Sequence, residues 1–152
     1  MNKHVTFHPE TGQEATRNSK NRTYTHAIWV QIPWEWRVRA LENEVKHNRE
    51  NAAEYRAVIA DVEAGRPISD PRSRESHEKW GWTVENEWLP WAESCERRAE
   101  SAQAEADRIR EAQEDEPWGV VGWAGRPDLA EKRAASEAKN GWRTLITEAI
   151  VS

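Results

Sequence analysis

The chain has 152 residues, of which 32% are charged and 37% are hydrophobic, and its formal net charge is −5. This length suits one folded unit with a buried core. The acidic balance argues against general affinity for nucleic acid, which needs a basic face. A single cysteine excludes an internal disulfide. No secretory signal and no membrane-spanning apolar run is visible, so we expect a cytoplasmic protein.

The N-terminal third has strand character in two places, residues 3–8 and residues 22–32. In the second segment, apolar and polar side chains alternate with the period of two that is typical of a strand. We predict that the two segments pair as a hairpin. The connection between them, residues 9–21, is longer than a tight turn requires and could extend the same ladder.

Two long helices are predicted by apolar residues spaced alternately four and three apart. The first helix covers residues 34–64 and ends at Gly65, and the second covers residues 83–114. Between them, the polar linker 66–82 reverses the chain, with a short helical turn near residues 73–79. We therefore expect an antiparallel, coiled-coil-like helical hairpin.

Two polar or helix-breaking residues lie within these tracks. Asn48 occupies a seam position, where a polar side chain commonly sets the register of the two helices. Pro90 lies near the start of the second helix, so its first turns are either kinked or a separate piece. Cys95 lies on the second track and is expected to be buried.

The last part of the chain predicts a strand over residues 118–124, a helix over 128–139 and a strand over 142–151. The fold class is therefore α+β. Residues 1–33 and 117–152 form a small, mainly antiparallel sheet of three or four strands with one packed C-terminal helix. Residues 34–116 form the helical hairpin, inserted between strands.

No motif for catalysis is present. The chain has no nucleophile elbow, phosphate loop or dinucleotide motif, and His77-Glu78 lacks the second histidine of a zinc-protease helix because residue 81 is glycine. His4, His8 and His26 are spaced loosely and lack a cysteine partner for a metal. We expect no enzyme activity, no catalytic residue, no metal and no cofactor.

The ten tryptophans are the stronger functional signal, since tryptophan is enriched in binding hot spots. Trp80 and Trp82 flank Gly81 near the hairpin tip, and Trp36 points away from the helical track that contains Trp34. Either the linker folds over the tip tryptophans, or they are presented to a partner. Coverage is favoured, because exposed tryptophan lowers solubility.

Two segments carry a resemblance to a known group of proteins. They are Asn-Arg-Thr-Tyr-Thr-His-Ala at residues 21–27 and Trp-Ala-Gly-Arg-Pro-Asp-Leu-Ala at residues 123–130. Together they resemble small uncharacterised proteins of phages and prophages from GC-rich bacteria. The resemblance implies a protein that is cytoplasmic in a bacterial host cell. It also implies that the protein binds and modulates or inhibits a host protein, including defence nucleases and CRISPR complexes.

In that interpretation the acidic second helix presents carboxylates to a basic groove, as nucleic-acid mimics do. The candidate carboxylates, which would act with the tryptophans above, are Glu96, Glu100, Asp107, Glu111, Glu114 and Asp115. A solvated polar face of an amphipathic helix is the simpler interpretation of the same residues.

Two alternatives remain open. A nucleic-acid-associated accessory factor would use Arg17, Lys20 and Arg22, although a charged hairpin edge explains these residues more simply. A structural or assembly protein would use the helical seam to form a homodimer. Nucleic acid is the less favoured partner, and no membrane partner is expected.

Overall fold

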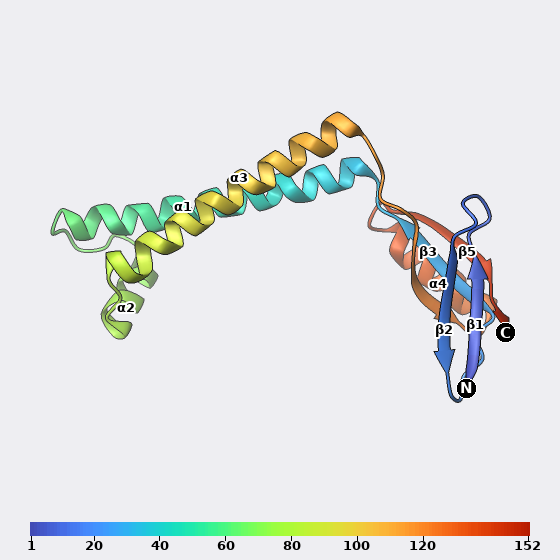
Figure 1. The fold of residues 1–152 in the computed structure, drawn as a ribbon. Coiled ribbons are helices and arrows are strands. Elements are labelled where there is room, and N and C mark those ends of the chain that lie inside the picture. The colour runs from blue at the N-terminus through green and yellow to red at the C-terminus, as the bar shows by residue number, and fades with distance from the viewer. The chain divides into compact units, whose positions relative to one another are not determined.

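The computed structural model describes residues 1–152 and has an α+β fold with a long helical hairpin, which confirms the predicted fold class (Figure 1). The chain divides into two compact units, a sheet unit of Met1–Trp36 with Gln113–Ser152 and a helical unit of Arg37–Ala112. The strands are β1 (Asn2–Phe7), β2 (Glu14–Ser19), β3 (His26–Gln31), β4 (Gly119–Ala124), β5 (Arg143–Glu148) and β6 (Ile150–Val151). The helices are α1 (Trp34–Glu63), α2 (Pro71–Trp80), the π-helical turn η1 (Val84–Trp88), α3 (Leu89–Ala112) and α4 (Pro127–Ala138).

The sheet unit contains two three-stranded antiparallel sheets, ordered β2-β1-β6 and β4-β3-β5, rather than one sheet. The predicted pairing of β1 with residues 22–32 is wrong. β1 instead pairs with β2, from Asn2 opposite Ser19 to Phe7 opposite Glu14. β2 is a polar edge strand without apolar alternation, so the periodicity by which strands are recognised is missing from its sequence.

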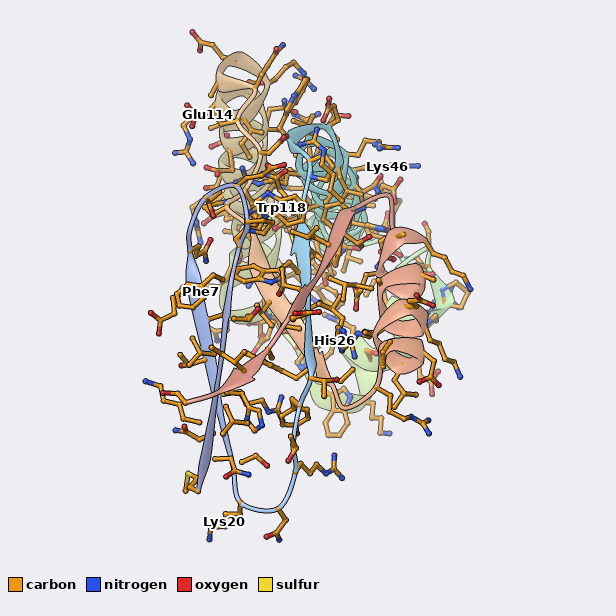
Figure 2. All side chains as sticks on the ribbon, turned by 90° about the vertical axis from the view of Figure 1, so that its right-hand side faces the viewer. Phe7, Lys20, His26, Lys46, Glu114 and Trp118 are labelled. Carbon is orange, nitrogen blue, oxygen red and sulfur yellow. The ribbon has the colours of Figure 1, made fainter.

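The β4-β3-β5 sheet is covered on one face by α4 and on the other by the β1-β2 ribbon (Figure 2). Against α4, small side chains allow close packing in a cluster of Ile28, Ala124, Ala130, Ala134 and Ile146. On the opposite face, Trp29 Nε1 donates to Thr147 Oγ1 at 2.7 Å, and Thr147 and Thr6 share a hydroxyl hydrogen bond of 2.6 Å. Thr6 then donates to the carbonyl of Glu148, so each buried polar group in this chain of contacts is satisfied.

Two buried histidines, one on β1 and one directly after it, accept hydrogen bonds from backbone N–H groups. His4 Nε2 accepts from the N–H of Tyr24 at 3.0 Å, and His8 Nδ1 accepts from the N–H groups of Glu10 and Thr11 at 3.2 Å. His8 Nε2 is buried without a hydrogen-bond partner, and the His8 ring lies 5.4 Å from that of Trp29. Both histidines are therefore core residues of the sheet unit.

In the helical unit, α1 and α3 contribute the two predicted tracks to the buried seam. The buried track residues are Val38, Val45, Ala52 and Ile59 in α1 and Cys95, Ala99, Ala102, Ala106 and Ile109 in α3. Val58 and Ala92 are buried as well, although they lie outside the predicted tracks. The half-buried Asn48 donates its amide to the carbonyl of Glu44 in its own helix, so it makes no hydrogen bond across the seam. Apolar packing, rather than a polar pair at Asn48, aligns the helices.

Candidate interaction site

The closed end of the helical hairpin, where residues 64–83 connect α1 to η1, is built around the carboxylate of Asp61. Gly65 ends α1 in the left-handed conformation, at φ 71°. Asp61 then accepts hydrogen bonds from the backbone N–H and the hydroxyl of Ser69 and from the guanidinium of Arg66. The Ser69 N–H, followed by the Arg66 side chain, lowers the pKa of Asp61 against the opposing effect of burial. The linker is thereby held against the end of α1.

α2 is longer than the helical turn that the sequence predicts, and both of its ends carry recognisable caps. Asp70 accepts from the N–H and hydroxyl of Ser73, which lowers the Asp70 pKa, and Pro71 occupies the first turn. Gly81 ends the helix at φ 62°. The chain is then free to turn back, which places Trp82 beside η1.

Pro90 explains why the second long helix begins with a π-helical turn. Proline has no N–H to donate and its ring would clash with the carbonyl four residues earlier in an α-helix. The wider turn η1 precedes it, so Pro90 falls in the first turn of α3, where a missing N–H is harmless. Thr83 caps η1 by accepting from Asn86 N–H, while Glu87 accepts from the N–H of Thr83. Of the two predicted alternatives, Pro90 therefore marks a separate first piece.

These elements bring together an aromatic cluster of Tyr55, Trp82, Trp88 and Trp91. The ring centroids lie 4.8 Å apart for Trp82 and Trp91, 5.3 Å for Trp82 and Trp88, and 5.5 Å for Trp88 and Trp91, all edge to face. Trp88 is the centre of the cluster, since it is only 2% exposed and donates its indole N–H to His77 Nδ1 at 3.0 Å. This bond also fastens α2 to η1.

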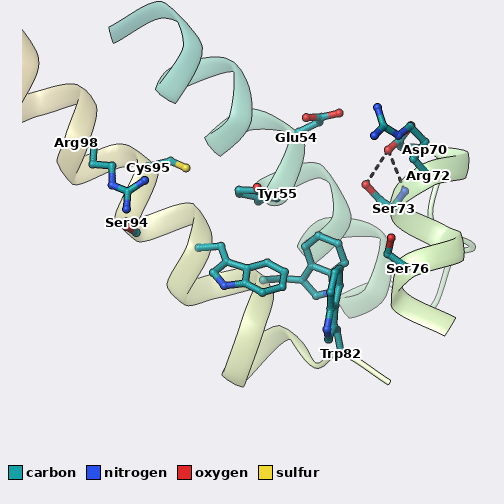
Figure 3. A pocket seen from close by; sticks show the side chains of 12 residues that line it. Glu54, Tyr55, Asp70, Arg72, Ser73, Ser76, Trp82, Ser94, Cys95 and Arg98 are labelled. Atoms are coloured by element: carbon teal, nitrogen blue, oxygen red, sulfur yellow. Dashed lines mark hydrogen bonds between the residues drawn. The ribbon is translucent and has the colours of Figure 1, made fainter. Parts of the chain in front are cut away.

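Beside the cluster is a hollow of about 590 Å³ (Figure 3). Its lining comes from α1, α2, η1, α3 and the linker: Glu54, Tyr55, Asp70, Arg72, Ser73, Ser76, Trp82, Trp88, Trp91, Ser94, Cys95 and Arg98. Burial raises the pKa of Tyr55, so its phenol remains a neutral hydrogen-bond donor. Neither Arg72 nor Arg98 forms an ion pair, although Arg72 is close enough to Asp70 to help lower the pKa of that carboxyl. The hollow therefore combines an aromatic wall with two available guanidinium groups, a chemistry suited to binding.

The three tryptophans named from the sequence have different surroundings. Trp80 is 62% exposed, with the Lys79 ammonium 5.0 Å from its ring centroid. Trp82 is half-buried against Trp88 and Trp91, so one of the two tip tryptophans is covered by packing in the cluster and the other is open. Trp36 belongs to the sheet unit, where it is half-buried and packs edge to face on Trp142 at 5.3 Å.

The six acidic candidates do not form one free face. Glu96 pairs with Arg56 at 2.7 Å, and Asp107 pairs with Arg110 at 3.4 Å. Glu114 also has a partner. Exposed carboxylates remain at Glu100 and Glu111.

Asp115 has a structural role in the sheet unit, away from the acidic face that the sequence suggested. It accepts from the N–H of Trp34 at 2.9 Å and pairs with Arg143 at 2.5 Å. The Trp34 N–H and then Arg143 lower the Asp115 pKa, while burial opposes them. Its carboxylate thus fixes the start of α1 to the segment before β4.

The three basic candidates for a nucleic-acid site lie near one another in the sheet unit. The Arg17 guanidinium is 5.0 Å from the ring centroid of Tyr24. Lys20 and Arg22 are exposed in the segment between β2 and β3, where Figure 2 marks Lys20. None of the three has an ion-pair partner.

Sequence reasoning missed five members of the hollow, which are Tyr55, Arg72, Trp88, Trp91 and Arg98. The repeated tryptophans around Gly81 were a usable signal for the cluster. Nothing in the spacing relates Tyr55 to Arg72, because the reversal of the chain brings them together.

The structure brings together no group of three or more His, Cys, Asp or Glu side chains that could hold a metal ion. None of its helices combines the length and the apolar character needed to cross a membrane. Comparison of the chain with protein families, with curated proteins and with solved structures finds no match.

Proposed function

We propose that the protein acts by binding another protein, and that the hollow at the closed end of the helical hairpin receives a segment of the partner. The observation that carries the proposal is the aromatic wall of Tyr55, Trp82 and Trp91 in this hollow; a 62% exposed tryptophan, Trp80, ends α2 in the same unit. Tryptophan, tyrosine and arginine are the residues most enriched in interface hot spots, and such residues favour well-packed pockets.

The chemistry of the hollow describes the partner segment. An apolar or aromatic side chain would enter against the tryptophan rings, which bury large area at small cost in side-chain entropy. The unpaired guanidinium groups of Arg72 and Arg98 would receive a carboxylate or backbone carbonyls of the same segment. In this proposal the main contact is made by the aromatic end of the hairpin. The exposed carboxylates Glu100 and Glu111 contribute only at the rim of the interface.

The partner class to test first is a bacterial host protein, since the resemblance to phage-borne proteins implies host modulation, including interference with a defence complex. Tagged wild type would be used to capture partners from a bacterial lysate, and each captured protein would then be produced pure and titrated against variants. A direct titration is needed because tryptophan-rich surfaces also capture proteins non-specifically.

Three variants separate the competing surfaces. Arg72→Glu with Arg98→Glu changes the lining of the hollow through two exposed side chains, so the fold is retained. Glu100→Lys with Glu111→Lys changes the acidic face, and Arg22→Gln changes the sheet unit. We expect the affinity of a purified partner for the first variant to fall by about tenfold or more, as it does when hot-spot residues are changed. The proposal is wrong if the hollow variant binds like wild type while the acidic-face variant does not, or if no purified partner binds wild type.

A further inference from the structure

A second hollow, of about 350 Å³, lies in the sheet unit and is independent of the helical hairpin. Three stretches of chain form its walls: the segment that leads into β3, the end of β4, and α4. The lining residues that matter below are Arg22, Tyr24, Gly122, Trp123, Gly125 and Arg133. The hollow thus joins parts of the chain that are about 100 residues apart in sequence.

Two glycines shape this hollow by their lack of a side chain. A Cβ at Gly122 would stand 3.7 Å from the guanidinium carbon of Arg133, so the Arg133 side chain lies over the space that a larger residue would fill. A Cβ at Gly125 would come within 3.2 Å of the Thr23 carbonyl. Thr25 N–H donates to the Ala124 carbonyl at 2.9 Å, which ties the two walls together. A Cβ at Gly122 would thus make an ordinary contact, and only a larger side chain there would displace Arg133, whereas the closeness of the walls depends on Gly125.

The charge of the hollow is opposite to that of the protein. Arg22 and Arg133 are the only charged residues in its lining, in a chain whose net charge is −5. Arg133 donates one hydrogen bond from Nε to the Glu137 carboxylate and another from Nη2 to the Val121 carbonyl. These bonds orient the guanidinium and leave its other N–H groups able to donate to a ligand. Arg17, stacked on Tyr24, and Lys20 add two nearby cations without ion-pair partners.

Aromatic surface accompanies these cations. Tyr24 and Trp123 both line the hollow, with ring centroids 6.3 Å apart, and the half-buried Trp123 remains accessible. Arginine binds phosphate through paired hydrogen bonds, and an accessible indole stacks on nucleobases. An acidic peptide would satisfy the arginines but would leave the aromatic wall unexplained.

We propose that this hollow binds a nucleotide phosphate, with Arg22 and Arg133 on the phosphate and the base against Trp123. Two sources share this chemistry, a free nucleotide and a single strand of nucleic acid. The proposal does not depend on the function assigned to the helical hairpin, since every residue it uses lies in the sheet unit.

The test uses full-length protein and fluorescence anisotropy with a labelled 12-nucleotide oligothymidine, alongside a labelled adenosine triphosphate analogue. Arg22→Gln removes an exposed cation, and we expect its affinity to fall about tenfold or more, the usual effect of losing a hydrogen bond to a charged group. Lys139→Gln is the matched control, because it makes the same charge change on an exposed residue after α4 that does not line the hollow. The control is expected to bind within about twofold of wild type.

A second variant tests the shape of the site. Gly122→Leu would displace the Arg133 guanidinium, and we expect weaker binding with circular dichroism like that of wild type. For the oligonucleotide, log affinity should fall with log salt by about 0.7 for each phosphate contacted. Binding of the oligonucleotide alone identifies the single strand as the source, and binding of both probes identifies the nucleotide itself.

The proposal is overturned by any of three results. These are no binding of either probe in low salt, equal weakening by Arg22→Gln and Lys139→Gln, and equal competition by a non-aromatic polyanion such as polyglutamate. If Gly122→Leu alters the circular dichroism, the comparison of Arg22→Gln with its control still decides the matter, because both of those side chains are exposed.

Discussion

Replacing Trp88 by alanine should destabilise the helical unit more than any other single truncation at the closed end of the hairpin. The Trp88 side chain is 2% exposed and contacts Trp82, Trp91 and Tyr55, while its indole N–H donates to His77. A buried tryptophan removes about 150–250 Å² from water, which at about 25 cal/mol per Å² amounts to about 4–6 kcal/mol. Measured truncations of buried aromatic residues cost about 3–5 kcal/mol, and we expect a value in that range.

Trp80→Ala is the matched control, since it makes the same chemical change in the same unit on a side chain that is 62% exposed. Surface substitutions of this kind change the free energy of unfolding by about 0.5 kcal/mol or less. Trp88→Phe should fall between the two, because it keeps a buried ring but loses the hydrogen bond to His77.

The assay is urea unfolding followed by circular dichroism at the helical wavelength, because α1 and α3 supply most of the helical residues. The three variants would be compared with wild type by unfolding midpoint and slope. Equal destabilisation by Trp88→Ala and Trp80→Ala, or a loss below about 1 kcal/mol for Trp88→Ala, would refute the assignment of Trp88 as the centre of the cluster.

Three further outcomes are expected from the same structure. The hydrogen bonds from the linker backbone and from arginine lower the pKa of Asp61 in the folded state, so the stability they provide is fully present above the unfolded value near pH 4 and is lost as pH falls through the folded pKa. The free energy of unfolding, measured over a pH series, should therefore exceed that of Asp61→Asn by less in acid than at neutral pH. The same difference at every pH would contradict this prediction. His4→Leu leaves the buried N–H of Tyr24 without its acceptor, so denaturant unfolding should show the sheet unit losing about 1–3 kcal/mol. Ala106→Leu overpacks a fully buried seam position and should cost about 1–3 kcal/mol by thermal or urea unfolding, whereas the exposed Ala104→Leu should be nearly neutral.

Local pattern determined the helices of this protein. The tracks through Val45 and Ala99 predict which faces are buried, because a helix repeats its side-chain positions along one stripe whatever its neighbours are. Gly65 and Pro127 likewise mark a helix end and a helix start through backbone preferences that act within a few residues. For the same reason the strands β3 to β5 could be located before their partners were known.

Strand pairing and the surroundings of individual side chains were decided only by the tertiary structure. β2 is polar throughout and is recognised as a strand only through its backbone bonds to β1. Trp36 and Trp82 look alike in the sequence as tryptophans off a helical track, yet one packs on Trp142 and the other joins the cluster at Trp88. The spacing of residues along the sequence does not predict such contacts.

The two hollows were also decided only by the tertiary structure. Tyr55 and Arg98 lie on different helices and share a hollow because the chain reverses between them, and Arg22 and Arg133 share the other because β4 and α4 fold back beside the entry to β3. The sequence alone could determine the residue types that favour binding, since aromatic rings and guanidinium groups carry that chemistry wherever they lie. Their convergence required the closure of long loops, which depends on the packing of the whole unit and leaves no periodic signal in the chain.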